Sequence, residues 1–573
     1  MEPLWEIQRP DPVLLDHLQQ NLSCRPATAA VLANRQIADA EQARCFISDG
    51  LGQLPDPFDL VDLDRAARRI YTALKKNENI LIFGDYDVDG ITATALMVQF
   101  LAYLGARVDY YVPHRTREGY GLKPIHIESV AVPRKIDLII TVDCGSTALE
   151  ALKLAAAAGI DVIVTDHHRI DEELPPALAL INPHRPDCPS GLELLSGAGV
   201  AFYLLIFLRK YLREHQFWTT RPEPALKAIC DLTALGTVAD MMPLSGANRL
   251  LVKAGLEIIN GQPRMGLKAL MRASRLVPGT VDAEDLAFRL IPRLNAAGRM
   301  GHANSAVRLL ITPRQDQAEH LAQNLDKLNQ QRQQVEGKLV ADIITHLEAN
   351  PAMLKFPALV LADTGWHEGV LGIAASRVAR RFHRPVVIMT LRDGLYRGSA
   401  RSIAGFDLFN GLVACQADLA AFGGHSMAAG LQVAPDKLDV FREHFQNVAA
   451  RKLDGENNRP VLTIDAELPL NQIDRRLFDE LELLQPFGHQ NPQPLFMTRD
   501  VTVASHRKMG KGHRRMVLEQ NGATMEALHF NIDPRHKPPR RMAQIAFQLK
   551  WNNWRGADRP QILLKAVEFP IAS

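Results

Sequence analysis

The sequence lacks the cysteine spacing of zinc sites. Its 573 residues include only six cysteines, and no two of them form a CxxC pair. They are Cys24, Cys45, Cys144, Cys188, Cys230 and Cys415. Paired thiolates at short spacing are typical of structural zinc sites, so the sequence gives no sign of one. Isolated thiols are typical of a reducing compartment, and we expect a cytoplasmic protein.

Long hydrophobic runs are also missing. The longest, Gly199–Leu208, reaches only about half the length of a membrane-spanning helix. The first residues, MEPLWEIQRPD, do not have the charged-then-apolar order of a signal peptide. We therefore expect a soluble intracellular protein with no membrane contact.

The chain has little net charge, no internal repeat and no low-complexity tail. A formal net charge of +2 does not by itself indicate a nucleic-acid-binding protein. The distribution is more informative, because Val501–Pro560 contains twelve Lys/Arg against four Asp/Glu, a local net charge of +8. The length exceeds what one hydrophobic core supports and predicts roughly three or four domains.

The pattern of apolar residues predicts an α/β protein. From about residue 56, β-branched runs alternate with Ala/Leu-rich helices, which is typical of a doubly wound parallel sheet. Five or six short strands near the C-terminal end are typical of an OB-like β-barrel. The expected order is an N-terminal helical segment (1–55), a doubly wound domain (56–310), a long connecting helix (311–350), a second α/β domain (351–455) and the barrel (460–573).

The connecting helix is predicted by a stretch with almost no helix-breaking residue. Between Pro313 and Asn350 the sequence is rich in Gln, Leu, Lys and Glu, which favour helix. At 1.5 Å per residue such a helix would span on the order of 50 Å. The alternative is a pair of helices that meet near Gly337. The glycine-rich segments GSARS and GGHSMAAG of the second α/β domain are expected to be turns.

Acidic residues gather in four motifs: FGDYDVDG (83–90), TVDCG (141–145), TDHH (165–168) and GTVADMMPL (236–244). Three of them end or follow an apolar run that is typical of a buried strand. Because the carboxyl ends of parallel strands meet at one edge of a sheet, we expect these side chains to share a small volume. The residues concerned are Asp85, Asp87, Asp89, Asp143, Asp166, His167, His168 and, from the fourth motif, Asp240.

So many carboxylates in one place require cations. Two unit charges about 4 Å apart repel by about 4 kcal/mol at an effective dielectric constant of 20. Oxygen ligands with one or two imidazoles suit Mn²⁺ or Mg²⁺. Two such ions about 3.5–4 Å apart catalyse phosphoryl transfer by stabilising the attacking and leaving oxygens. The sequence therefore predicts a two-metal site in which Asp143 is the natural bridging ligand.

The first motif has two simpler interpretations. An EF-hand calcium loop needs a bidentate Glu at its twelfth position, where this chain has Leu96, and the motif follows a strand rather than a helix. In the other interpretation the carboxylates only cap the next helix. Three aspartates at alternate positions do not all cap one helix, and capping does not explain Asp143 or TDHH.

The set DYDVDG, VDCG, TDHH and TVAD resembles motifs I to IV of the DHH phosphoesterase superfamily. The later GWHEGVLGIAASR, GSARS and GGHSMAAG resemble its associated C-terminal domain. The resemblance implies metal ligation by Asp87, Asp89, Asp143, His167 and Asp240, with Asp85 and Asp166 in the same cluster. It assigns His168 to substrate or phosphate contact. Some related pyrophosphatases place a histidine ligand where this chain has Phe83, so one metal position is expected to be weaker or more open.

Basic and small polar residues are expected to hold the phosphates of a nucleic acid. Arg115 and Arg117 follow a predicted strand, and PRLNAAGRM contains Arg293, Asn295 and Arg299. In the second α/β domain, Ser399 and Arg401 are expected to bind a 5′-terminal phosphate, with Gly424 and His425 near the scissile bond. Together with Asp143 and His168, His425 and Arg299 complete the expected catalytic set. A solvated loop remains the alternative for Arg115 and Arg117, and a core or turn position for His425.

The basic C-terminal region adds candidates for binding a single strand. They are Arg507, Lys508, Lys511, Arg514 and Trp551. Basic groups that follow phosphates, with aromatic rings for base stacking, are typical of single-strand grooves. The alternative is a solvated barrel surface with tryptophans in the core.

The complete order of domains is similar to the single-strand-specific 5′→3′ DNA exonucleases of the superfamily. This resemblance implies release of 5′-mononucleotides, with roles in recombinational repair and mismatch-repair excision. The implied partners are single-stranded DNA, single-strand-binding protein and a RecQ-type helicase, and a monomer is expected. Two alternatives stay open: a phosphodiesterase for short oligonucleotides or cyclic dinucleotides, and a non-catalytic DNA-binding replication factor.

Overall fold

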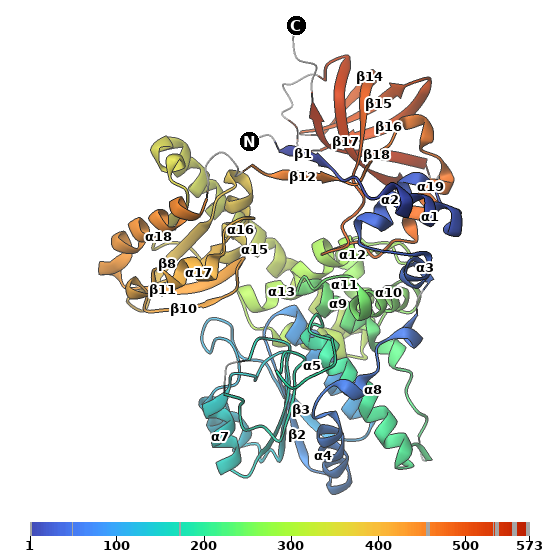
Figure 1. Ribbon diagram of the computed structural model, residues 1–573. Coiled ribbons are helices and arrows are strands. Elements are labelled where there is room, and N and C mark those ends of the chain that lie inside the picture. Colours follow the sequence, from blue (N-terminus) through green and yellow to red (C-terminus); the bar gives the residue numbers. More distant parts are fainter. Residues whose placement is uncertain are drawn as a thin grey trace. The chain divides into compact units, whose positions relative to one another are not determined.

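The computed structural model describes residues 3–48, 50–170, 173–219, 221–453, 459–510, 512–530, 532, 538–552 and 559–568. The chain forms two compact units (Figure 1). Unit 1 comprises Met1–Leu54, Pro243–Lys253 and Pro460–Ser573. Unit 2 comprises Pro55–Met242 and Ala254–Arg459. The chain therefore returns to unit 1 twice after leaving it.

The first half of unit 2 contains a five-stranded, fully parallel sheet in the order β3-β2-β4-β5-β6. Its strands are β2 (Asn79–Gly84), β3 (Arg107–Tyr111), β4 (Leu138–Val142), β5 (Asp161–Thr165) and β6 (Ala179–Ile181). Numbered from the first strand of the sheet, this order is 2-1-3-4-5, so the chain reverses direction between β2 and β4. In doubly wound sheets, ligands bind beside the carboxyl ends of the strands at this reversal.

Helices cover the sheet. The face of the sheet that carries Leu81, Ile139 and Val162 packs against Leu152 of α7. Helix α5 contacts β2 and β3, and helix α8 contacts β4 and β5 (Figure 1). Apolar residues on both faces explain why β2 and β4 are almost continuously buried runs. The helices up to the long connecting helix are α4 (Leu63–Lys76), α5 (Val88–Tyr103), α6 (Pro124–His126), α7 (Leu149–Ala157), α8 (Gly197–Glu214), α9 (Cys230–Ala239), α10 (Gly246–Gly261), α11 (Met265–Ala273), α12 (Ala283–Asp285), α13 (Ile291–Met300) and α14 (Asn304–Ile311).

A single helix, α15 (Gln315–Ala349), joins the two halves of unit 2. It runs through Gly337 without a break, so the alternative of two shorter helices was wrong. A Cβ atom at Gly337 would have no heavy atom within 4 Å, which shows that this glycine is not required by packing. Apolar residues along α15, such as Leu325, Leu339 and Leu347, are buried and fix the helix against its neighbours.

The second half of unit 2 has a mixed five-stranded sheet in the order β10-β11-β9-β8-β7. Its elements are β7 (Leu359–Ala362), α16 (Leu371–Phe382), β8 (Val386–Arg392), β9 (Leu395–Arg401), α17 (Leu408–Val413), β10 (Ala421–Gly424), β11 (Ala428–Val433) and α18 (Leu438–Lys452). The expectation that GSARS is a turn was wrong, because it lies within β9 up to Arg401. GGHSMAAG includes a turn around His425, but its ends belong to β10 and β11.

Unit 1 contains the C-terminal barrel. Strands β14, β15, β16, β18 and β17 form a closed cycle, because β14 also pairs with β17. The closed five-stranded barrel confirms the predicted OB-like fold. The elements in this part are β12 (Val461–Ile464), β13 (Ala466–Glu467), α19 (Arg475–Glu482), β14 (Phe496–Met509), β15 (His513–Gln520), β16 (Ala523–His529), β17 (Arg541–Asn552) and β18 (Arg559–Glu568).

The N-terminal segment belongs to the same unit as the barrel. It begins with a strand, β1 (Leu4–Ile7), which pairs in parallel with β12. Helices α1 (Pro12–Leu22), α2 (Pro26–Asn34) and α3 (Ala40–Ser48) follow. Leu18 and Leu32 share one buried cluster with Phe547 of the barrel. The segment is therefore neither purely helical nor a separate body. Within the described residues, no helix is both long and apolar enough to cross a membrane.

Candidate metal centre and phosphate-binding surface

The acidic motifs lie at the carboxyl ends of neighbouring strands, at the reversal point of the parallel sheet. Asp85 and Asp87 follow β2, Asp143 follows β4, and Asp166 follows β5. Asp143 has a left-handed backbone conformation, with φ of 61°, which a short polar side chain tolerates. Asp87 caps α5 by accepting a hydrogen bond from Gly90 N at 3.1 Å. Capping therefore accounts for this one carboxylate and not for the others.

Three sets of side chains are close enough to hold metal ions, with ligand atoms within 4.8 Å of one another. They are Asp85–Asp87–Asp143, Asp89–His167–Asp240 and Asp143–His167–His168. Asp143 and His167 each belong to two sets, and His167 Nε2 lies 3.1 Å from Asp143 Oδ1. Asp240 reaches the cluster from the end of α9, with its Oδ2 3.6 Å from His167 Nε2. The sheet thus brings together residues that are separated by more than 150 positions.

The chemistry of this cluster fits divalent cations. Asp85 Oδ1, Asp143 Oδ1 and His167 Nε2 are buried and have no hydrogen-bond partner in the described part of the chain. Burial, and then the charges of Asp89 and its neighbours, raise the pKa of Asp143 well above its usual value. Burial followed by repulsion from Asp87 raises the pKa of Asp89 to about 7. Buried, mutually repelling carboxylates are stable as anions only beside positive charge.

Asp89 is held by the start of α8. Its two oxygens accept hydrogen bonds from Gly197 N at 2.6 Å and Ala198 N at 2.9 Å. The positive end of the helix dipole favours an anion there. A Cβ atom at Gly197 would lie 2.5 Å from Asp143 Cβ, and one at Gly236 would lie 2.3 Å from Asp89 Oδ1. These glycines let α8 and α9 approach the acids, and Gly197 was not among the predicted site residues.

Asp166 orients the loop that carries the histidines. Its oxygens accept hydrogen bonds from the backbone N–H groups of Ser146, His167 and His168, and from His168 Nδ1 at 2.8 Å. Asp166 is in none of the three ligand sets, although we predicted it as a metal ligand. Because its oxygens already accept these bonds, the geometry favours a positioning role.

The two adjacent histidines have opposite protonation preferences. Burial, and then the charge of His168, lower the pKa of His167 to about 4, which favours a neutral imidazole that can bind a metal. Burial also opposes charge on His168, but the hydrogen bond and charge of Asp166 outweigh it and raise the pKa to about 9. Tyr120, which we did not predict, lies 3.0 Å from His168 Nδ1 through its hydroxyl. Phe83 is buried, stacks on Tyr111 and supplies no ligand atom.

Arginines converge beside the acids within unit 2. Arg299 on α13 donates to Gly369 O at 3.3 Å. Burial, and then the charges of Arg115, Arg332 and Arg401, lower the pKa of Arg299 to about 9. Arg115 also lies over the ring of Tyr86, at 4.8 Å from its centroid. So many cations in one place favour a polyanionic ligand. Arg332 on α15 was not predicted, because nothing in its helical sequence distinguishes it from a solvated residue.

A second anion-binding arrangement lies at the start of α16. Arg401 Nη1 donates to Ser399 Oγ at 3.0 Å. A Cβ atom at Gly372 would lie 2.9 Å from Arg401 Nη2 and 3.0 Å from Ser399 Oγ. The guanidinium, the hydroxyl and the N-terminal turn of the helix therefore face one another, which is suited to a phosphate. Gly424 ends β10, and His425 follows in the turn, where burial and then the charges of His168 and Arg169 lower its pKa.

Three of the residues that were predicted to bind phosphate have other surroundings. Arg293 bonds Asp326 of α15 at 2.8 Å, so its guanidinium is already engaged. Asn295 is one turn before Arg299 on α13, and its Oδ1 is buried with no hydrogen bond in the described residues. Arg117 is exposed in the loop after β3. Of the predicted phosphate-binding residues in unit 2, the structure brings Arg115, Arg299 and Arg401 together.

The residues of unit 1 that were predicted to bind a single strand lie in different surroundings. Arg507 and Lys508 are exposed near the end of β14. Arg514 is buried, because it continues the inward-facing positions of Met516 and Leu518 on β15. Trp551 likewise continues an inward row of β17, and its ring packs at 4.5 Å from that of Phe478. Arg514 is therefore inside the barrel, and Trp551 is half-buried against its core, in line with the core alternative for the tryptophans; their roles in binding a strand stay predictions. Lys511 lies outside the described residues.

The sheet, the acidic switch point and the facing arginines define a metal-dependent phosphoesterase of the DHH type. The DHH family N-terminal domain matches residues 79–237, the DHHA1 domain matches 355–451, and the RecJ OB domain matches 464–566. Several relatives match this chain over nearly its whole length. The chain belongs to the RecJ family of single-stranded-DNA-specific exonucleases.

The relatives include RecJ of Bacillus subtilis, which is 36% identical over 98% of this chain and 70% of its own length. RecJ of Dickeya dadantii is 38% identical over 88% of this chain and 90% of its own. Among solved structures, RecJ of Thermus thermophilus in complex with Mn²⁺ matches with a TM-score of 0.82 and 32% identity, covering 99% of this chain and 80% of that one. The same protein in complex with Mg²⁺ matches with a TM-score of 0.74 and 29% identity, covering 99% and 79%.

Proposed function

We propose that this protein degrades single-stranded DNA from its 5′ end and releases 5′-mononucleotides by two-metal hydrolysis. Its family is specific for single-stranded DNA. The observation that carries the proposal is the set of buried carboxylate and imidazole atoms without partners, among the described residues, at the reversal point of the sheet. Charged arginines lie near the same cluster within unit 2, as a phosphodiester substrate requires.

The cofactors are divalent cations of the Mn²⁺ or Mg²⁺ type, as in the Thermus thermophilus structures. We assign their binding to Asp85, Asp87, Asp89, Asp143, His167 and Asp240. Two ions bound there would supply an activated water and would stabilise negative charge on the reacting oxygens. Asp143 is shared between the sets, which suits a bridging ligand.

The remaining residues of the site act on the substrate. His168 donates Nδ1–H to Asp166, so its Nε2–H remains available as a cationic donor to a phosphate oxygen. Arg299 balances the charge that develops on the phosphate during hydrolysis. His425, whose pKa responds to the charge of His168, contacts the phosphodiester from the second sheet.

The 5′→3′ polarity is assigned to the phosphate-binding group around Arg401. Ser399, Arg401 and the start of α16 at Gly372 would bind the terminal 5′-phosphate, while the acidic cluster cleaves the following bond. Both belong to unit 2, so the terminal phosphate and the reacting phosphate are held by one compact unit.

Replacing Arg401 with alanine is expected to lower the preference for 5′-phosphorylated over 5′-hydroxyl ends by about tenfold, because a charged hydrogen bond to phosphate contributes about 1.5–3 kcal/mol. The measurement is the ratio of digestion rates on the two substrates. Arg397→Ala is the matched control, since Arg397 lies on the same strand but pairs with Asp393. Equal end preference in Arg401→Ala and wild type would remove Arg401 from this role.

The stabilisation of the folded protein by bound metal ions is expected to increase with pH. The pKa values of Asp89 and Asp240 are raised to about 7 and about 8 in the metal-free protein. Carboxyls with a raised folded-state pKa hold extra protons there, so their contribution to stability is lost as pH rises from about 4 through these values. A metal ion that replaces these protons binds more tightly at high pH.

The expected result is a larger rise in Tm on adding Mg²⁺ at about pH 8 than at about pH 6. Thermal unfolding with and without EDTA provides the measurement. Asp240→Asn should reduce the difference between the two pH values. A rise in Tm that is the same at both pH values would contradict the raised pKa values of Asp89 and Asp240.

The class and polarity of the reaction are tested by digesting long single strands labelled at the 5′ or the 3′ end, with Mn²⁺ and Mg²⁺ added separately. The proposal expects 5′ label to be released first, as mononucleotide. A preference for dinucleotides or cyclic dinucleotides over long strands would instead support the phosphodiesterase alternative. Binding without any hydrolysis would support the non-catalytic one.

The exposed end of β14 is proposed to bind the strand electrostatically. Each cation that neutralises a phosphate of a single strand contributes about 0.7 to the slope of log K against log salt. Replacing both Arg507 and Lys508 with alanine should therefore reduce this slope by about 1.4 in a salt titration of binding. Arg515→Ala should have a smaller effect, because Arg515 pairs with Glu526. An unchanged slope in the double variant would exclude this surface.

The cellular role is proposed from the family. We infer action in the cytoplasm as a monomer, in recombinational repair and mismatch-repair excision, with single-strand-binding protein and a RecQ-type helicase. The helicase would supply the single strand that this enzyme degrades. Digestion of a duplex with a short 5′ single-stranded end should therefore increase when both partners are added. No increase would argue against the cooperation.

A further inference from the structure

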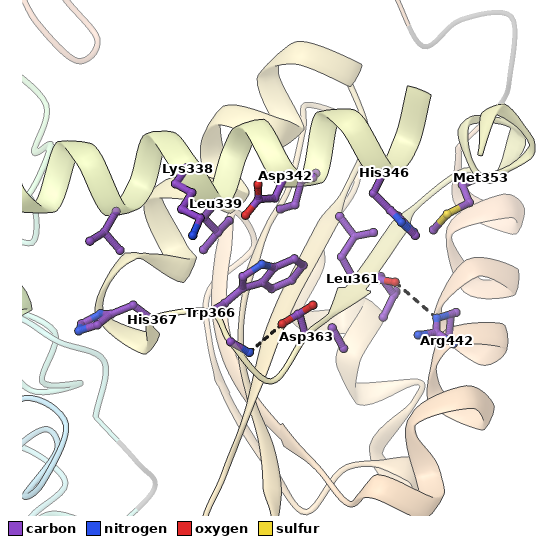
Figure 2. Close-up of a pocket in the computed structure, with 15 residues that line it drawn as sticks. Lys338, Leu339, Asp342, His346, Met353, Leu361, Asp363, Trp366, His367 and Arg442 are labelled. Atoms are coloured by element: carbon purple, nitrogen blue, oxygen red, sulfur yellow. Dashed lines mark hydrogen bonds between the residues drawn. The ribbon is translucent and has the colours of Figure 1, made fainter. Parts of the chain in front are cut away.

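Unit 2 contains a cavity of about 760 Å³ away from the acidic cluster (Figure 2). It is open to solvent on one side and is bordered by α15, by β7 and the loop that follows it, and by α18. Aliphatic side chains of α15 and β7 form much of its wall. Cavities of about 300–1,000 Å³ with apolar walls and a few polar groups are typical of small-molecule sites.

Trp366 supplies the aromatic surface of this cavity. Figure 2 shows its indole in the middle of the cavity, between Asp342 on α15 and Asp363 on the loop after β7. Within the part of the chain that the structure describes, the indole N–H makes no hydrogen bond. An indole face that borders open space is a stacking surface for a planar ring, and stacking on a nucleobase contributes about 1–3 kcal/mol.

The charged groups around Trp366 have unused hydrogen-bonding capacity. Lys338 and Asp342 on α15 make neither an ion pair nor a side-chain hydrogen bond among the described residues. Asp363 accepts one bond, from Gly365 N to Oδ1 at 2.7 Å, which leaves its other oxygen available. Arg442 is different, because it bonds Val360 O at 3.4 Å and pairs with Asp439. The cavity thus offers two carboxylate acceptors beside the indole and one ammonium donor.

This combination excludes several ligand classes. Among the described residues, every group of side chains suited to a metal ion lies at the acidic cluster, so the cavity is not a metal site. Inorganic phosphate leaves the indole face uncovered, and the charged side chains disfavour a lipid chain. A planar base with N–H donors fits, because it stacks on the indole and donates to a carboxylate. Guanine fits best, since its N1–H and N2–H groups donate in parallel to one carboxylate.

The cavity adjoins the catalytic surface through His367. This residue also lines a smaller cavity of about 220 Å³, together with His114, Gly298 and Arg299. His367 Nδ1 accepts a hydrogen bond from Gly369 N at 3.1 Å, and Arg299 donates to Gly369 O. The backbone of Gly369 is therefore hydrogen-bonded to both side chains, through its N–H group to His367 and through its carbonyl oxygen to Arg299. His367 borders both cavities, and both belong to unit 2.

We propose that the cavity binds deoxyguanosine 5′-monophosphate, with guanine stacked on Trp366 and hydrogen-bonded to Asp342 or Asp363, and the phosphate beside Lys338 and His367. The ligand belongs to the class of product that the proposed function releases, and its identity as a product rests on that function. The site is separate from the phosphate-binding group around Arg401.

Calorimetric titration of the metal-free, full-length protein tests the proposal without requiring hydrolysis. The probes are the four deoxynucleoside 5′-monophosphates. We expect a site that prefers dGMP, besides binding of any 5′-monophosphate at the Arg401 group, and Trp366→Ala should weaken dGMP binding at the preferring site by about tenfold or more. Asp342→Asn should reduce the preference for dGMP over dCMP. The exposed Lys338→Ala, which should not affect folding, should weaken dGMP more than deoxyguanosine.

Two controls separate this site from the catalytic surface. Trp218→Ala, at another partly buried tryptophan of unit 2, should keep all dGMP binding unchanged, whereas Arg401→Ala should remove only the binding that does not distinguish the bases and keep the preference for dGMP. Loss of binding in Arg401→Ala with retention in Trp366→Ala and Lys338→Ala would place the nucleotide at the terminal-phosphate group and overturn the proposal. Absence of dGMP binding to wild type would also overturn it. Neither result bears on the proposed nuclease activity, which the end-labelled digestion tests separately.

Discussion

Replacing Asp143 with alanine is expected to lower the turnover of single-stranded DNA by at least about 10³-fold, which corresponds to about 4 kcal/mol of lost transition-state stabilisation. Asp143 belongs to two of the three ligand sets, and its Oδ1 is buried without a hydrogen-bond partner among the described residues. Its removal therefore takes away a carboxylate that lies between the Asp85–Asp87 side of the cluster and His167. Binding of the strand should remain close to wild type, because the arginines and the exposed end of β14 are untouched.

The stability of the same variant distinguishes a metal ligand from a structural residue. Neighbouring carboxylates and burial raise the pKa of Asp143, so its removal relieves repulsion in the metal-free protein. Thermal unfolding of Asp143→Ala in EDTA should give a Tm at or above that of wild type, whereas added Mn²⁺ should raise the Tm less. Asp316→Ala, an exposed aspartate paired with Arg314, is the control. Near-normal turnover, or a lower Tm in EDTA, would contradict the assignment.

Replacing Glu336 with alanine is expected to lower the free energy of unfolding by about 3–5 kcal/mol. Glu336 is fully buried on α15, where it accepts a bond from Arg332 Nη1 at 2.5 Å and pairs with Arg377 Nε of α16 at 2.7 Å. Its loss leaves the buried guanidinium of Arg332 with the bond to Asn329 Oδ1 at 2.6 Å and without its counter-ion. A buried charge without its counter-ion is the costly state.

The chain provides a matched control on the same pair of helices. Glu348 of α15 pairs with Arg381 of α16 at 3.9 Å, and both side chains are exposed. Glu348→Ala should therefore cost no more than about 1 kcal/mol. Urea unfolding of both variants gives the comparison. Equal losses would mean that burial does not decide the contribution of the Glu336 pair.

The acidic cluster was predictable because sheet geometry converts sequence position into spatial position. Once β2, β4 and β5 are recognised as parallel strands, the residues that follow them must meet at one edge. The role of Asp166 was not predictable in this way. Its difference from Asp143 lies in which oxygens accept backbone hydrogen bonds, and that depends on the path of the loop.

Other features depended on burial, which periodicity does not reveal. Arg332 and Glu336 stand in a helix rich in polar residues, where charged side chains are usually solvated. GSARS was predicted as a turn from its composition, yet Gly398 lies in β9, where it pairs with Met389 of β8 and Leu431 of β11. Glycine fits there because a Cβ atom would be 2.4 Å from Met389 Cγ. Trp551 was predicted as a stacking residue from its basic neighbours, although its position in the inward row of β17 decides its surroundings.

The pairing of β1 with β12 has a consequence for synthesis on the ribosome. The ribosome makes Leu4 before its partner Val461, which follows more than 450 residues later. At about 5–20 residues per second, roughly 25–90 s separate the two. Unit 2 can fold during this interval, whereas apolar side chains such as Leu18 and Leu32 must wait for the barrel. Nascent chains stalled before residue 460 should therefore bind holdase chaperones through the segment that carries α1, α2 and α3.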